Sequence, residues 1–270
     1  MSWCDIGVNF TDKRLNFETV LERALAAGVS HLIITGTSED KSQQAVDLAK
    51  QHPDHLSATV GVHPHDANQF TDQTIDKLRT LAQSTSVVAI GECGLDFNRN
   101  FSTPENQRFA FEQQLKLACE LELPVFLHER DAFEAQIELL AKYRHHLKGG
   151  VVHCFTGNTE QMNRYLDLDL YIGVTGWVCD PKRGQSLRDA VASLPLERVL
   201  LETDAPYLRP KGLANNRKLD KGNNEPAYLP YIAAEVASLM TTDINSLQLA
   251  SLANTQALFG FTHINVNDAK

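Results

Sequence analysis

Several short apolar runs in this chain end in side chains that bind metal ions or move protons. The residues that close these runs are His63 with His65, Glu92, His128, His153, Asp204 and, more weakly, Asn9. Each run has the length and composition of a buried strand. Imidazole nitrogens and carboxylate oxygens bind divalent cations, so strands that end in them predict one metal site and a metal-dependent hydrolase.

Four of these residues form the predicted ligand set of a single divalent cation. They are Glu92, His128, His153 and Asp204. Successive members are separated by ~30 to ~50 residues, the length of whole strand-helix units. Any one of them alone would more often be an ordinary core or surface residue. Four acidic or imidazole side chains at strand ends favour a mixed nitrogen and oxygen site over that interpretation.

Asp204 is also predicted to act as a general base. It lies two residues after Glu202, and residues at this spacing on a strand point to the same face, so both carboxylates are expected to face the site. A carboxylate beside a metal can accept a proton from the attacking water. The alternative is that Asp204 forms only an ordinary turn before Pro206.

His63 and His65 flank a proline, and the restricted backbone of Pro64 presents both imidazoles from a stiff turn. His63 is expected to be catalytic. It could donate a hydrogen bond to a phosphate oxygen or protonate the leaving group, and the sequence does not distinguish these two roles. Two other interpretations stay open. The pair could belong to a zinc site, or it could lie in a polar loop without function.

The chain around these residues alternates apolar runs with amphipathic stretches. Strands are predicted at 3–9, 31–35, 56–62, 87–92, 124–128, 150–154, 170–174 and 198–203. Helices are predicted at 17–27, 39–51, 72–83, 104–121, 131–145, 159–168, 183–193, 226–240 and 243–258. Repeated strand-helix units predict an α/β fold, a (β/α)8 TIM barrel that residues 1–270 form as a single domain. The strand ends then share one face, where the candidate ligands can meet.

Composition limits the classes of function. The 270 residues are 43% hydrophobic and carry a formal charge of −9, which provides a core but disfavours a wide surface for duplex nucleic acid. No apolar run approaches the ~20 residues of a membrane span, and no secretory signal is recognised. Without a C-x-x-C pair, the five cysteines predict neither disulfides nor a zinc ribbon. We expect a cytoplasmic monomer without membrane contact.

Longer motifs carry a family resemblance. They are Gly61-Val62-His63-Pro64-His65, Gly91-Glu92-Cys93-Gly94-Leu95-Asp96-Phe97, Pro124-Val125-Phe126-Leu127-His128, His153-Cys154-Phe155-Thr156-Gly157, Glu202-Thr203-Asp204-Ala205-Pro206 and Asn224-Glu225-Pro226-Ala227. Together they resemble the TatD family of metal-dependent deoxyribonucleases over nearly the whole chain. The resemblance implies an amidohydrolase-like barrel and a magnesium-dependent 3′-to-5′ exonuclease for single-stranded DNA and RNA, with a role in DNA repair.

The resemblance also assigns roles. It implies metal ligands at Glu92, His128 and His153, a catalytic carboxylate at Asp204 and an active-site lining residue at His63. The chain departs from the His-x-His that many relatives carry at the end of the first strand, where it has Gly7 and Asn9. We therefore expect loosely held Mg²⁺, with Mn²⁺ or Zn²⁺ as alternatives, rather than two tightly bound zinc ions.

Substrate binding is predicted at His65, Asn9, Arg99 and Arg130. The basic segment 209–221, with five lysine or arginine residues and one aspartate, could hold neighbouring phosphates. Aromatic rings could stack on a terminal base unless they pack in the core, and the candidates are Phe97, Phe101, Trp177 and Tyr207.

Two rival functions stay open. One is an ester or amide hydrolase on the same barrel, such as an aminoacyl-tRNA deacylase. The other is a metal-binding partner protein without turnover.

Overall fold

The computed structural model describes residues 2–212 and 222–261 of the chain. Its eight strands belong to one sheet, and their order in the sheet is their order in the sequence. The strands are β1 (Trp3–Val8), β2 (Val29–Ile34), β3 (Leu56–Val60), β4 (Val87–Asp96), β5 (Val125–Arg130), β6 (Gly150–Val152), β7 (Tyr171–Val174) and β8 (Val199–Leu201).

Helices separate successive strands. They are α1 (Phe17–Ala26), α2 (Glu39–Gln51), α3 (Asp72–Leu81), α4 (Pro104–Leu121), α5 (Phe133–Tyr143), α6 (Thr159–Asp167), α7 (Gln185–Val191), α8 (Leu229–Leu239) and α9 (Ile244–Phe259). The strands are parallel from β3 to β6 and from β7 to β8. A parallel bridge between Val8 and Ala205 joins the end of β1 to the segment after β8. This is the topology of a (β/α)8 TIM barrel, so the fold prediction is confirmed.

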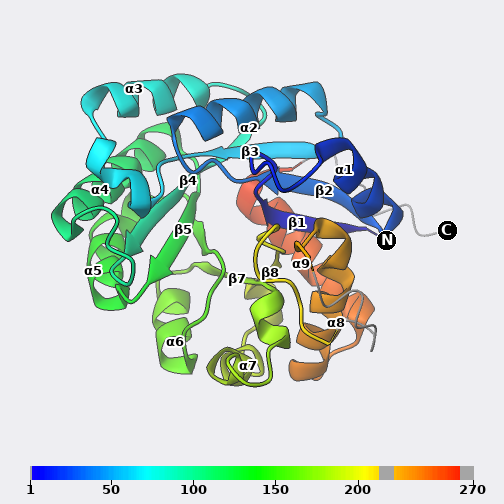
Figure 1. Cartoon of the computed structure of the whole chain (residues 1–270). Coiled ribbons are helices and arrows are strands. Elements are labelled where there is room, and N and C mark those ends of the chain that lie inside the picture. The colour runs from blue at the N-terminus through cyan, green and yellow to red at the C-terminus, as the bar shows by residue number, and fades with distance from the viewer. Residues whose placement is uncertain (1, 213–221, 262–270) are drawn as a thin grey trace. The chain divides into compact units, whose positions relative to one another are not determined.

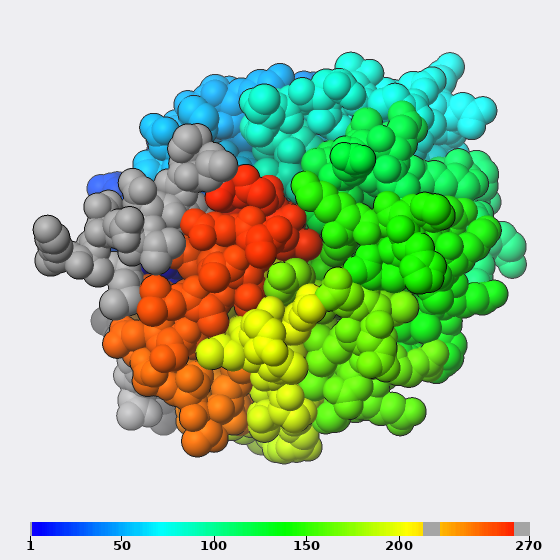
Figure 2. Space-filling view, turned by 180° about the vertical axis from the view of Figure 1, so that it is seen from behind, coloured from blue at the N-terminus to red at the C-terminus, as the bar shows by residue number. Residues whose placement is uncertain are grey.

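The chain divides by its internal contacts into two compact units. One unit comprises Met1–Ile33, Cys154–Asn163 and Ile172–Lys270, and the other comprises Ile34–His153 and Arg164–Tyr171. In the second unit α2 and α3 lie side by side, and α2 packs on β3 (Figure 1). In the first unit α9 packs on β8 and on the short turn η4 (Leu196–Arg198) before it. Figure 2 shows α9, coloured orange to red, on the face seen from behind. The single domain stays a prediction.

Local sequence signals explain where the helices begin. Helix α4 starts at Pro104 directly after Thr103, whose hydroxyl accepts a hydrogen bond from the backbone N–H of Asn106. The predicted helix over 226–240 is in fact a 3₁₀ turn, η6 (Pro226–Tyr228), followed by α8. Pro230 lacks an N–H and fits only the first turn of α8, which separates the two pieces. No helix among the described residues is long and apolar enough to cross a bilayer.

The longest strand differs most from its prediction. Glu92 was expected to end a strand at 92, but β4 continues to Asp96. The register with β5 advances from the pair Ile90 and Val125 to the pair Cys93 and Leu127. The two residues between Ile90 and Cys93 therefore oppose only one on β5, which is a β-bulge. Such a bulge redirects side chains locally, and Glu92 is one of the two residues in it.

Candidate active site

The carboxylate of Glu92 lies among imidazoles in the unit that contains β3 to β6. Its Oε1 is 2.9 Å from Nδ1 of His128, 3.0 Å from Nε2 of His153 and 3.4 Å from Nε2 of His63. His128 lies on β5, and His153 directly follows β6. Strands that are far apart in the sequence thus bring these four side chains together, as the sequence predicted for Glu92, His128 and His153.

The cluster fits a divalent cation. One ligand atom each from His63, Glu92 and His128 lies within 4.8 Å of the other two. Nε2 of His128 is buried and has no hydrogen-bond partner, and a buried nitrogen of this kind is available to a ligand from outside the chain. Imidazole nitrogen with carboxylate oxygen suits first-row divalent ions. His63, predicted as a catalytic residue, therefore also lies within reach of a metal.

Electrostatics holds Glu92 and His63 in the forms that bind a cation. Burial raises the pKa of Glu92, but the charges of His153 and His63 and hydrogen bonds from His128 and His153 outweigh it, so the pKa is well below its ordinary value. Burial lowers the pKa of His63 to about 4, helped by the charge of His128. At neutral pH Glu92 is thus ionised and His63 is neutral, which are the forms that ligate metals.

A second carboxylate, Asp96, lies beside this cluster. Its Oδ2 is 2.7 Å from Nε2 of His65 and 3.6 Å from Nε2 of His128. Burial raises the pKa of Asp96, but the nearby His128 and hydrogen bonds from His65 and the backbone N–H of Arg99 lower it by more, so Asp96 is ionised. Asp96 was not among the predicted site residues. Its spacing of four residues from Glu92 on one strand was the available signal, because even spacings share a face.

Asp204 lies in the other unit, in the loop that follows β8. The backbone N–H of Asp204 donates to the carbonyl of Gly7 at 2.9 Å, and the Asn9 amide donates to its Oδ1 at 2.9 Å. Asp204 has a φ of 53°, in the left-handed region that aspartate tolerates better than most residues. The end of β1 therefore orients this carboxylate. Contact between Asn9 and substrate stays a prediction, as does the place of Asp204 in the ligand set.

The shared orientation of Glu202 and Asp204 toward the site stays a prediction. Strand β8 ends at Leu201, so the alternation of side chains along a strand does not apply to either carboxylate. Glu202 is buried, and its Oε1 accepts a hydrogen bond from the backbone N–H of Cys154 at 2.5 Å. Glu202 thus holds the turn that follows His153.

The loop with Asp204 rests on a buried carboxylate of β1. Asp5 accepts hydrogen bonds from the backbone N–H of Thr203 at 2.9 Å, from the Thr203 hydroxyl at 2.5 Å and from the backbone N–H of Gly7 at 3.2 Å. The Asn224 amide donates to the carbonyl of Thr203 at 2.8 Å. This network fixes the backbone on the N-terminal side of Asp204.

Comparison with known proteins decides the family. Residues 4–260 match the family described as TatD related DNase. The chain belongs to this family. It is 48% identical over 257 residues to a protein of Erwinia tasmaniensis named 3′-5′ ssDNA/RNA exonuclease TatD, a match that covers 94% of this chain and 98% of that one. A protein of the same name from Yersinia pseudotuberculosis is 49% identical over 257 residues, with 94% and 98% covered.

Solved structures agree with the family. A TatD homolog from Escherichia coli K12 has a TM-score of 0.87 and 31% identity, and the match covers 96% of this chain and 98% of that chain. A TatD family hydrolase from Entamoeba histolytica has a TM-score of 0.83 and 28% identity, with 96% and 98% covered. A more distant likeness, to a phosphotriesterase homology protein of E. coli, has a TM-score of 0.55 and 13% identity over 95% of both chains. That likeness supports the barrel fold alone.

A TatD-family nuclease must also hold a polyanion, and the predicted cations differ in their availability. Arg99 and Arg130 are exposed, and neither forms an ion pair within the described ranges. Arg209 instead donates to the carbonyl of Asn223, and Lys211 lies 2.7 Å from Asp180. The other basic residues of segment 209–221 lie outside the described residues.

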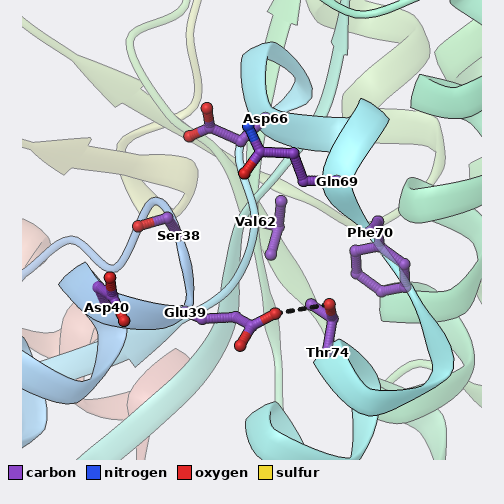
Figure 3. Close-up of a pocket in the computed structure, with 8 residues that line it drawn as sticks. All are labelled: Ser38, Glu39, Asp40, Val62, Asp66, Gln69, Phe70 and Thr74. Carbon is purple, nitrogen blue, oxygen red and sulfur yellow. Dashed lines mark hydrogen bonds between the residues drawn. The ribbon is translucent and has the colours of Figure 1, made fainter.

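A cavity of about 350 Å³ opens beside the turn that carries His63 and His65 (Figure 3). Its lining residues are Ser38, Glu39, Asp40, Val62, Asp66, Gln69, Phe70 and Thr74. Among them Glu39 accepts a hydrogen bond from the Thr74 hydroxyl at 2.6 Å (Figure 3). Three carboxylates line this cavity, and Lys77, which is not among the described lining residues, lies 3.6 Å from Glu39 and from Asp40. The lining itself therefore disfavours phosphate groups.

Proposed function

We propose that the chain is a divalent-metal-dependent 3′-to-5′ exonuclease that acts on single-stranded DNA and RNA. The chain belongs to a family of DNases, which are hydrolases of phosphodiester bonds, and its relatives are named for the 3′-5′ activity. The observation that carries the proposal is the buried, ionised carboxylate of Glu92 among three imidazoles.

Glu92, His128 and His153 are proposed as metal ligands, with Asp204 completing the set. When bound, a divalent cation polarises the scissile phosphate and makes a water molecule a better nucleophile. Mg²⁺ is the ion expected from the family resemblance. The imidazole nitrogens around Glu92 also favour binding of Mn²⁺, and Zn²⁺ is the third ion to test.

Asp204 is proposed to take the proton from the attacking water. The carboxylate accepts a hydrogen bond from Asn9 on one oxygen, Oδ1, at 2.9 Å, which orients the group and leaves lone pairs on Oδ2 for a water molecule. Because the φ of 53° and the bond to Gly7 hold the backbone, the carboxylate does not need to reorganise when substrate arrives.

His63 and His65 are proposed to have different roles toward the scissile phosphate. Nδ1 of His63 accepts a hydrogen bond from the backbone N–H of His65 at 3.1 Å. The proton of the neutral His63 ring is therefore on Nε2. With a pKa of about 4, His63 donates a hydrogen bond to a phosphate oxygen rather than a whole proton. His65, held by Asp96, is the better candidate to protonate the leaving oxygen.

The test is digestion of a 5′-labelled single-stranded oligonucleotide with Mg²⁺, Mn²⁺, Zn²⁺ or EDTA. We expect a ladder that shortens from the 3′ end, inhibition by EDTA and resistance of a substrate with 3′-terminal phosphorothioates. Exposed arginines at Arg99 and Arg130 would bind the phosphates. Activity that EDTA does not change, or cleavage of an aminoacyl ester in place of the oligonucleotide, would contradict the proposal.

One variant isolates the chemistry. Asp204→Asn keeps a hydrogen-bonding group but removes the base, and we expect turnover to fall by about two to four orders of magnitude with an unchanged melting temperature. Asp189→Asn on α7 is the control, because this aspartate is exposed and bonded only to its neighbour Gln185 at 2.7 Å among the described contacts. Near-normal turnover in Asp204→Asn would remove this residue from the mechanism.

A further inference from the structure

Phe101 is the most exposed large hydrophobic side chain in the described part of the chain. Its exposure is 63%, whereas the next, Tyr207, is 47% exposed. An exposed aromatic ring gains free energy when a flat apolar surface covers it. The ring lies in the segment between β4 and α4, next to the turn that carries Asp96 and Arg99.

A series of rings connects Phe101 to the candidate metal centre. The centroids of Phe101 and His65 are 4.8 Å apart with an interplanar angle of 84°. His65 is in turn 4.2 Å from His63, and His63 faces Glu92 at 3.4 Å. All four residues belong to one compact unit. A group stacked on Phe101 would therefore lie beside the imidazoles proposed to act on the scissile phosphate.

Hydrogen bonds hold the backbone around Phe101 in place. The buried Ser102 hydroxyl donates to the carbonyl of His65 at 2.8 Å and accepts the backbone N–H of Asn68 at 2.9 Å. Asn68 in turn accepts the backbone N–H of Thr103 at 3.0 Å, where α4 is capped. Because this segment is already ordered, binding to the ring costs little conformational entropy.

The other candidate rings are already covered by cations. A guanidinium carbon lies 5.8 Å from the ring centroid of Phe97, 4.6 Å from that of Trp177 and 4.4 Å from that of Tyr207. The guanidinium groups come from Arg108, Arg183 and Arg14 respectively. Within residues 2–212 and 222–261, no cation covers Phe101.

The surroundings of Phe101 indicate what covers it. A surface that docks a protein is a contiguous apolar patch of several hundred Å², but Asn98, Arg99 and Asn100 beside this ring are polar and exposed. A single exposed ring two residues after Arg99, which forms no ion pair with the described residues, suits one base and its phosphate. The cavity that Asp66 and Glu39 line (Figure 3) has three carboxylates in its lining, whereas the exposed guanidinium of Arg99 attracts phosphates.

We infer that Phe101 is the stacking platform for one base at the 3′ end of the single-stranded substrate. Stacking on an aromatic ring accepts any base, because every base has a π-face. The platform positions the terminal nucleotides so that the scissile phosphate meets His63 and His65. This inference rests on the proposed exonuclease activity and adds a binding residue that contributes no ligand and no proton.

The test combines a change in the protein with a change in the substrate. Kinetics are measured for wild type and Phe101→Ala on a natural oligonucleotide and on two matched oligonucleotides with one abasic residue, at the terminal or the penultimate position. We expect Phe101→Ala to raise KM about tenfold on the natural substrate, with little change in kcat. One abasic substrate should show the same rise with wild type, and Phe101→Ala should raise it no further.

Two further variants separate stacking from a general effect of losing a ring. Phe109→Ala on α4 is the matched control, because Phe109 is 46% exposed and also makes one edge contact, with Phe70. Its KM should match wild type, whereas Phe101→Trp should keep the low KM. Equal KM values for Phe101→Ala and Phe109→Ala would overturn the inference. A further rise in KM from wild type to Phe101→Ala on both abasic substrates would also overturn it. Wild type that digests no oligonucleotide with any of the three metals would instead refute the proposed function.

Discussion

At the scale of single residues, the site separates two kinds of buried carboxylate. Glu92 is ionised because imidazoles surround it, and it is therefore available to a cation. Asp5 is buried without any cationic partner among the described contacts, and burial raises its pKa to about 7, although hydrogen bonds from Thr203 and Gly7 oppose the shift. The same residue type thus supports metal binding at one position and backbone structure at the other.

Asp5 makes stability depend on pH. A pKa raised from an ordinary value near 3.8 to about 7 means that the folded chain keeps a proton that the unfolded chain loses. Its contribution is present in full below about pH 4 and is lost as pH rises through about 7. We expect the unfolding free energy of wild type to fall, relative to Asp5→Asn, by about 1 kcal/mol per pH unit between pH 4.5 and 6.5.

The measurement is urea unfolding of both proteins across this pH range. The difference between their unfolding free energies removes the contribution of titrating groups that both proteins share. Asn at this position retains an oxygen for the backbone N–H of Thr203 and places an amide opposite the Thr203 hydroxyl, which can accept from it. A wild-type curve parallel to that of Asp5→Asn would show that Asp5 is ionised in the folded protein.

At the scale of elements, buried glutamines position the strands that carry the site. Gln114 on α4 accepts the backbone N–H of Val62 at 2.8 Å and donates to its carbonyl at 3.0 Å, directly before His63. Gln107 on the same helix accepts the backbone N–H of Asp96 at 2.8 Å and donates to the carbonyl of Asp96 at 3.0 Å. It also donates to the carbonyl of Ser102 at 2.9 Å. These side chains satisfy backbone groups that regular strand pairing leaves unpaired.

Replacing one of these glutamines should affect stability and activity together. In Gln107→Leu the backbone groups of Asp96 lose their partners inside the protein, and we expect the unfolding free energy to fall by about 2–4 kcal/mol. Turnover should fall as well, since Asp96 holds His65. Denaturant unfolding and oligonucleotide digestion measure the two effects, with Gln113→Leu, half-buried on the same helix, as the control. Equal stability of the two variants would contradict this role for Gln107.

The elements were largely predictable and the site geometry was not. The bounds of α4 follow from Thr103 and Pro104 at its start, which are local signals in the sequence. The bulge that contains Glu92 depends on the register with β5, and register involves a second strand that no local window of the sequence contains. The left-handed conformation of Asp204 likewise depends on contacts with β1. The sequence therefore predicts that Glu92, His128 and His153 meet, but Asp96 was not among the predicted site residues.

At the scale of the whole molecule, charge limits how nucleic acid binds. A formal charge of −9 over 270 residues opposes a long electrostatic interface, because each phosphate contact needs a local cation. The exposed arginines Arg99 and Arg130 come from neighbouring strand ends, and Arg130 pairs in register with Asp96. Few contacts, concentrated at one place, suit the end of a single strand better than the length of a duplex.

The dependence of kcat/KM on salt tests this limit. Each phosphate contact with a single strand contributes a slope of about −0.7 to a plot of log affinity against log salt, so two contacts predict a slope of about −1.4. We expect Arg99→Gln and Arg130→Gln each to reduce the slope by about 0.7. Arg79→Gln on α3 should leave it unchanged, because Glu120 and Asp76 already pair with that arginine. A wild-type slope steeper than about −4, insensitive to both changes, would mean that an extended basic surface binds the substrate instead.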